Sequence, residues 1–193
     1  IYESVLLSIR SLIDTSGMDA SDILAVGIDS QMAGIMGIDD DFNPVTYYDS
    51  WLDTRCEKYL NEMNKKAGDR IIEVTGCPVT YTHGPKILWW KYEHPDAYKK
   101  IAKFVLPHVF VVGKMTGLKA KEAYFDYTCI QYSGFGDNKN LVWSDELLFM
   151  FDIDLSKMAR IASPFEIVGT VTGEAASLCG LKKGTPLVAG AGD

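Results

Sequence analysis

The sequence predicts a mixed α/β domain in which short apolar strands alternate with amphipathic helices. Several segments repeat apolar residues with a helical period, and other apolar runs have the length of a buried strand. The chain has 193 residues, of which 47% are apolar and 23% charged, so it can bury one substantial core. No internal repeat or linker-like stretch divides it.

The first quarter of the chain predicts one helix and a hairpin. Apolar residues from Val5 to Ile13 share one helical face, and Gly17 ends that helix. Residues 23–28 have the composition of a buried strand, and a second strand is expected over residues 34–39. The acidic run that follows favours a solvated turn rather than a metal site, with residues 45–48 returning as the partner strand.

Glycine and proline divide the middle of the chain into predicted helices. These helices cover residues 53–67, 69–75, 86–92, 94–101 and 107–116. A strand is expected over residues 104–106, whereas residues 123–136 show no clear period and predict irregular structure.

The last part of the chain predicts a helix over residues 143–151 and then a strand, helix, strand unit. That unit covers residues 167–171, 173–179 and 187–191. Gly190-Ala191-Gly192 then allows a sharp turn that presents the side chain of Asp193. Taken alone, such an aspartate is more often a turn residue than a catalyst.

Composition favours small-molecule chemistry. The 19 basic and 26 acidic residues give a net charge of -7, which disfavours nucleic acid and anionic membranes as partners. Four widely spaced cysteines form no metal motif, and no apolar run is long enough to cross a membrane, so we expect reduced thiols and a cytoplasmic location. The chain begins with Ile1 in a helical pattern and shows no signal peptide, so we expect an interior boundary there.

A set of polar and aromatic residues follows the ends of predicted elements, where clefts form. The set comprises Gln31, Met32, Trp51, Asp53, Arg55 and Tyr81. A sugar or polyol needs this mixture, because polar groups bind its hydroxyls while aromatic faces cover its carbons. The alternative is that Trp51 and Tyr81 belong to the core and that Asp53 caps a helix. His83, His94 and His108 are scattered, which is typical of surface or packing residues, and no phosphate-binding loop motif occurs.

Six blocks in order resemble the N-terminal domain of FGGY carbohydrate kinases. They are Ile28-Asp29-Ser30-Gln31-Met32-Ala33-Gly34, Trp51-Leu52-Asp53-Thr54-Arg55, Pro85-Lys86-Ile87-Leu88-Trp89, Trp143-Ser144-Asp145-Glu146-Leu147-Leu148, Val168-Gly169-Thr170-Val171-Thr172 and the run from Gly184 to Asp193. The resemblance implies a ribonuclease-H-like, actin/hexokinase-type fold with a mixed sheet and flanking helices. It also implies that residues 1–193 are a partial N-terminal sugar-binding domain, without the opening Asp-x-Gly-Thr phosphate turn or the C-terminal ATP-binding domain.

The resemblance assigns roles to the candidate residues. Asp193 matches the catalytic base, and the positions that match substrate contacts are Gln31, Met32, Trp51, Asp53 and Tyr81. ATP and Mg²⁺ are the implied cofactors of the full-length protein, with their binding residues outside this chain. Arg55 is expected to brace the carboxylate of Asp53. The chain alone is expected to be inactive.

The substrate stays open at this stage. A pentulose such as xylulose is the first expectation, with another ketose, a polyol or a sugar acid as alternatives. The chain departs from xylulose kinases at Ala33, where they usually have a histidine, so a substrate-facing imidazole is missing. A non-catalytic sugar-binding or regulatory module of the same fold is the alternative to a kinase. A hydrolase that pairs Asp193 with Asp53 ranks last, and homodimer formation is left open.

Overall fold

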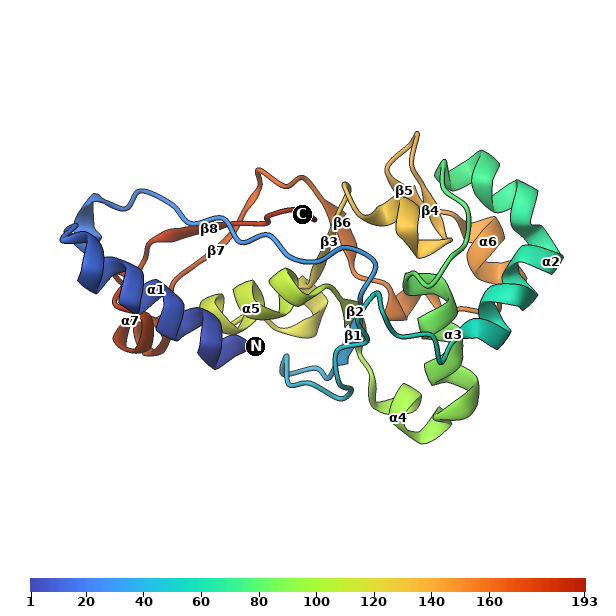
Figure 1. Cartoon of the computed structure of the whole chain (residues 1–193), viewed down its shortest axis with the longest axis horizontal. Coiled ribbons are helices and arrows are strands. Elements are labelled where there is room, and N and C mark those ends of the chain that lie inside the picture. The colour runs from blue at the N-terminus through green and yellow to red at the C-terminus, as the bar shows by residue number, and fades with distance from the viewer.

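The computed structural model describes all residues, 1–193, and seven α-helices carry most of its regular structure (Figure 1). The helices are α1 (Tyr2–Ser16), α2 (Glu57–Thr75), α3 (His83–Glu93), α4 (Pro95–Lys100), α5 (Pro107–Thr116), α6 (Asp145–Met150) and α7 (Gly173–Cys179). Four 3-10 turns join them: η1 (Ala20–Asp22), η2 (Ala120–Glu122), η3 (Ile130–Ser133) and η4 (Leu155–Lys157). No helix combines the length and apolar character that a membrane span requires.

The strands pair two by two. They are β1 (Met36–Ile38), β2 (Lys103–Val105), β3 (Tyr124–Asp126), β4 (Gly136–Asp137), β5 (Val142–Trp143), β6 (Arg160–Ala162), β7 (Ile167–Thr170) and β8 (Pro186–Val188). The pairs β1–β2, β4–β5 and β7–β8 are antiparallel, and β3–β6 is parallel. Isolated bridges extend these ladders, so the sheet is interrupted rather than continuous.

Most predicted helices are confirmed, because proline and glycine fix their ends. Pro95 and Pro107 occupy first helical positions, where a missing N–H costs nothing, and Gly117 ends α5 in the left-handed conformation. Helix α7 has the predicted bounds. The predicted break at Gly68 appears as a kink inside α2, where Ala67 has non-helical backbone angles.

Five predictions are wrong in detail. Residues 45–48 form no strand, because β1 pairs with β2 and only isolated bridges of Ile38 with Pro44 and of Ile35 with Asp49 close the hairpin. The helix predicted from residue 143 begins at Asp145, since Trp143 belongs to β5.

Residues 23–28 form no strand and are only partly buried: one bridge at Val26 joins them to β8, and Ile23 and Ile28 pack against the core while Leu24 is 84% exposed. Helix α2 begins at Glu57 rather than Asp53, since Asp53 binds its carboxylate to the backbone of Arg55 in a local turn. Residues 123–136, expected to be irregular, contain β3 and the first residue of β4, whose partners lie later in the chain.

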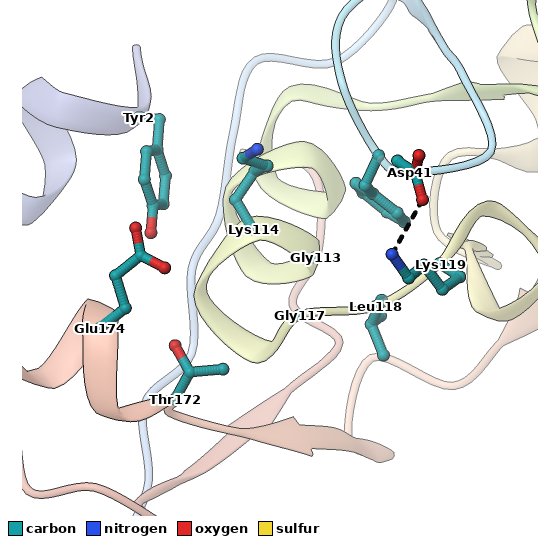
Figure 2. Close-up of a pocket in the computed structure, with 10 residues that line it drawn as sticks. Tyr2, Asp41, Gly113, Lys114, Gly117, Leu118, Lys119, Thr172 and Glu174 are labelled. Carbon is teal, nitrogen blue, oxygen red and sulfur yellow. Dashed lines mark hydrogen bonds and ion pairs between the residues drawn. The ribbon is translucent and has the colours of Figure 1, made fainter.

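The hairpin tip that precedes residues 45–48 is anchored on α5. Phe42 is buried against Gly113, and Lys119 forms an ion pair with Asp41 at 2.9 Å. Figure 2 shows this ion pair at one side of a pocket of about 200 Å³, with Tyr2 and Glu174 pointing toward one another at the other side. The three acids of the tip form a turn as predicted, and none of the candidate site residues lines this pocket.

One hydrophobic cluster of 42 buried residues unites the helices and strands, which supports a single domain. His83, at the start of α3, lies in the middle of it. Its ring is fully buried, contacts the edge of Phe125 and has no hydrogen-bond partner at either nitrogen. This places His83 among packing residues, as the sequence predicted.

The burial of His83 predicts a loss of stability in acid. Burial, followed by the charge of Lys86, lowers its pKa to about 3, although Asp126 opposes the shift. Below the ordinary histidine pKa the unfolded chain therefore takes up a proton that the folded chain refuses, so stability falls as pH falls. We expect this residue alone to contribute a slope of about 1.4 kcal/mol per pH unit through that window.

The measurement is the free energy of unfolding in urea at a series of pH values. We expect His83→Leu to remove this part of the slope, whereas His94→Gln, at an exposed histidine, keeps it. Equal slopes in wild type and His83→Leu would show that His83 is protonated within the fold.

Candidate functional site

Four of the six predicted site residues lie together. A pocket of about 390 Å³ is lined by Gln31, Met32, Ala33, Trp51, Tyr132 and Asp193. Its walls come from the segment after residue 28, the end of the hairpin, η3 and the end of the chain. Trp51 is 52% exposed, so its ring is a surface that a ligand can cover rather than part of the core.

Backbone hydrogen bonds hold the last residues of the chain against the segment that contains Gln31 and Met32. Ser30 N–H donates to the carbonyl of Ala191 at 3.2 Å, and Asp193 N–H donates to the carbonyl of Ser30 at 3.0 Å. Ala191 N–H donates to the carboxylate of Asp29 at 3.1 Å. The two segments run parallel, and this arrangement fixes where the Asp193 side chain begins.

The Asp193 carboxylate itself is anchored at one oxygen. Its Oδ1 accepts the backbone N–H of Met32 at 3.1 Å, and no protein donor binds Oδ2. An anchored carboxylate with one oxygen facing a pocket can accept a proton from a bound hydroxyl. The residue therefore has the geometry of a general base, as well as that of a structural turn.

Tyr48 contacts Gln31, one of the residues that line the pocket of Asp193. Its hydroxyl donates to Oε1 of Gln31 at 3.2 Å, and a Cβ on Gly34 would lie 2.0 Å from that hydroxyl, so only glycine allows the ring to pass. Burial, and then the charge of Asp193, raise the pKa of Tyr48 to about 12. The hydroxyl thus remains a donor at neutral pH and fixes the Gln31 amide.

A buried chain of polar groups lies beneath the pocket. Ser30 Oγ lies 2.7 Å from His108 Nδ1, and His108 Nε2 lies 3.2 Å from Asp126 Oδ2 without the geometry of a hydrogen bond. Asp126 accepts hydrogen bonds from Thr128, whose Oγ1 accepts the backbone N–H of Gly192 at 3.3 Å. The chain of contacts therefore joins both segments that hold Asp193.

This buried chain is structural. The side chains of His108 and Asp126 are completely buried, so neither can meet a substrate. Although burial raises it, the close contact with His108 and the hydrogen bonds from Thr128 hold the pKa of Asp126 below its ordinary value, so the carboxylate stays charged and keeps its partners in place. His108 is thus a packing residue, as predicted from its isolation in the sequence.

Asp53 and Tyr81 do not line the pocket of Asp193. Both oxygens of Asp53 accept hydrogen bonds from Arg55, at 2.9 to 3.0 Å from its Nε, so Arg55 contacts this carboxylate as predicted. Arg55 also pairs with buried Asp49 at 2.7 Å and lies 4.2 Å from the ring centroid of Trp89. Tyr81 lies beside Glu57 at the start of α2, with 3.5 Å between their oxygens.

Three residues of the site could not be found from the sequence pattern. Tyr132 lies in the segment expected to be irregular, and no periodic signal marks it. Tyr48 lies in the predicted return strand, residues 45–48, whose sequence predicts a strand but no functional role. Ala33 stands out in the sequence only as a missing histidine, yet it lines the pocket with a φ of 64°, a strained conformation that clusters at functional sites.

The chain has no metal-binding cluster and none of the common phosphate-loop motifs. No group of three or more His, Cys, Asp or Glu side chains could hold a metal ion. The four cysteines are free, and no phosphate-binding loop occurs. Since Asp53 is bound to Arg55 outside the pocket of Asp193, the structure does not favour a hydrolase that pairs these two carboxylates.

Comparisons with known proteins agree on one family. The family model described as FGGY family of carbohydrate kinases, N-terminal domain, matches residues 1–193. Xylulose kinase from Staphylococcus xylosus is 29% identical over 182 residues, which cover 93% of this chain. Autoinducer-2 kinase from Klebsiella pneumoniae is 26% identical over 189 residues, or 96% of this chain.

Solved structures show the same fold. Gluconate kinase from Lactobacillus acidophilus superposes on the whole chain with a TM-score of 0.86 at 22% sequence identity. The fold is thus the ribonuclease-H-like, actin/hexokinase-type fold, although its strands are short here. The chain spans 36% of the Staphylococcus relative, 35% of the Klebsiella relative and 38% of the Lactobacillus structure.

Proposed function

Because this chain belongs to the FGGY family of carbohydrate kinases, we propose that the protein of which it is a part phosphorylates a sugar in the pocket of Asp193. The observation that carries the proposal is the carboxylate of Asp193, anchored by Met32 at one oxygen and beside Gln31 and Trp51. A carboxylate, an amide and an exposed aromatic ring are the groups that bind and activate a polyhydroxylated molecule.

The proposed mechanism assigns proton transfer to Asp193. Its free carboxylate oxygen would accept the proton of a sugar hydroxyl while the hydroxyl oxygen forms a bond to the γ-phosphorus of ATP and the bond between that phosphorus and ADP breaks. MgATP supplies the phosphoryl group, and we propose that residues outside residues 1–193 hold it, since the chain spans 36% of its Staphylococcus relative and has no phosphate loop. The Gln31 amide orients a hydroxyl, with Met32 and Trp51 as apolar walls.

Asp53 and Tyr81 are kept in the proposal as outer substrate contacts. Arg55 holds the Asp53 carboxylate in one orientation, which favours a fixed hydrogen bond to a hydroxyl. Neither residue lines the pocket of Asp193, so we propose that they contact the substrate from outside it.

Among substrates, we propose a ketose or polyol, with a pentulose such as xylulose first. Relatives named xylulose kinase include that of Staphylococcus xylosus, and the chain keeps the glutamine and methionine of the corner. The pocket carries Ala33 where a histidine would add a donor, so a substrate that needs an imidazole there is disfavoured. The full-length protein screened for ATP-dependent phosphorylation of pentuloses, hexuloses, polyols and aldonates tests class and substrate together.

We also propose a cytoplasmic location, which the free thiols favour.

A non-catalytic sugar-binding module is the second candidate function. The pocket of Asp193 lies within this chain, and binding a sugar there requires no nucleotide site. The pocket therefore fits a sugar-binding module as well as it fits a kinase. Kinase activity of the full-length protein against any sugar decides between the two.

The 193-residue chain should bind a sugar without phosphorylating it. The proposed contacts from Gln31, Trp51 and Asp193 lie within it, whereas we propose that the residues that hold MgATP lie outside it. Calorimetry with the preferred sugar should show weak, saturable binding, and a coupled ADP assay should show no turnover. Turnover by the pure chain would contradict the proposed division of roles, and Trp51→Ala should abolish the sugar binding if the ring covers the ligand.

A further inference from the structure

Five lysines surround a second pocket, of about 370 Å³, formed by α4, β2, η2 and η4. It is lined by Asp40, Lys99, Lys100, Ile101, Ala102, Lys103, Ala120, Lys121, Ser156 and Lys157. It shares no residue with the pocket of Asp193. In Figure 1, α4 lies at the bottom of the view and the C-terminus lies above the middle, so this is a separate site.

The charge of this pocket is opposite to that of the chain. The whole chain carries a net charge of -7, whereas the pocket has five lysines and one acid, Asp40. Of these lysines only Lys99 forms an ion pair, with Asp96 at 3.5 Å, and both of those side chains are exposed. Like charges gathered in this way repel, and a bound anion relieves that repulsion.

Two of the lysines are held in fixed positions. Lys103 Nζ donates to the carbonyl of Met158 at 2.8 Å, and Lys157 Nζ donates to the carbonyl of Ile101 at 2.6 Å. An ammonium group has three donors, so each keeps two for a ligand. Burial lowers the pKa of Lys103, although Asp154 opposes this, so an added negative charge nearby favours its protonated form.

The lining also limits the chemistry of the ligand. Its apolar members are Ile101, Ala102 and Ala120, and no aromatic residue lines the pocket for a nucleobase to stack on. Compact ammonium groups bind phosphate oxygens as point charges. We propose that this pocket binds a small molecule that carries two or more phosphate groups and no base.

The test uses inorganic pyrophosphate and the 193-residue chain in calorimetric titrations at low ionic strength. Lys100→Gln/Lys121→Gln removes two exposed, unpaired charges of the pocket, and Lys182→Gln/Lys183→Gln removes two exposed charges elsewhere. We expect saturable binding that the first pair weakens by about tenfold or more and the second by no more than about twofold.

Three results would overturn the proposal. One is the absence of saturable binding to wild type, and another is an equal loss in both double variants, which would mean diffuse attraction. The third is that hexaglutamate binds and pyrophosphate does not displace it, because the pocket would then be a binding site for an acidic peptide. Amide NMR shifts of the wild-type chain give a second readout: the proposal requires the largest shifts at residues 99–103, and largest shifts elsewhere contradict it.

Discussion

Asp193→Asn in the full-length enzyme is expected to lower kcat by about 10²–10⁴-fold, with near-normal sugar affinity. Asparagine keeps the size of the side chain and an Oδ1 that can accept the N–H of Met32, so the anchoring hydrogen bond survives. It cannot accept the proton of an attacking hydroxyl. The measurement is steady-state kinetics with the preferred sugar, together with sugar binding by calorimetry.

Asp29→Asn is the matched control. The Asp29 carboxylate accepts the N–H of Ala191 at 3.1 Å, close to the base along the same pair of segments, and does not line the pocket. The same chemical change there should alter kcat by no more than about a few-fold, because the side-chain oxygen of the asparagine can still accept this N–H and the residue takes no part in proton transfer. Near wild-type turnover in Asp193→Asn would remove Asp193 from the mechanism and leave it a turn residue.

Gly190→Ala should destabilise the chain by about 2–5 kcal/mol, because two costs combine. Gly190 has a φ of 78°, where a Cβ is disfavoured, and that Cβ would lie 2.0 Å from the carbonyl oxygen of Ile28. A backbone oxygen has no rotamer with which to yield. The two segments that hold Asp193 must therefore separate, and we expect a lower urea midpoint together with loss of sugar binding.

Gly184→Ala separates the two costs. Gly184 has a φ of 90°, and a Cβ added there would have no neighbouring atom within 4 Å, so the substitution carries the conformational cost without the collision. We expect it to cost about 1–2 kcal/mol and to leave sugar binding unchanged. Equal destabilisation by the two substitutions would mean that the Ile28 segment moves freely, and that the pocket wall is not rigid.

Local signals allow the helices to be predicted, whereas the sheet depends on distant partners. Proline and glycine act within a few residues, so the bounds of α5 and α7 follow from the sequence. Strand β3 gives no such signal, because its partner β6 lies more than thirty residues later and its own residues are all buried, which removes the alternation that reveals a strand. Residues 23–28 show the converse, an apolar run whose local pattern predicts more burial than the fold provides.

The sequence likewise predicts some residues of the candidate site and not others. Four residues that line the pocket follow the ends of predicted elements, and the resemblance to FGGY kinases identifies them without the structure. They are Gln31, Met32, Trp51 and Asp193. Tyr132 and the supporting hydroxyl of Tyr48 come from contacts between segments, which no local pattern encodes. The buried contact of His108 with Asp126 is equally invisible in the sequence, because the spacing of the two residues gives no sign that ring and carboxylate meet.

The pairing of Met32 with Asp193 also governs when the pocket can form. The two residues are 161 positions apart, so closing this contact requires ordering nearly the whole chain. During synthesis the earlier helices can fold as they emerge, but the wall that holds the carboxylate waits until Asp193 itself is available. On the proposed function, we expect a folding intermediate or truncated product that lacks this contact not to bind sugar.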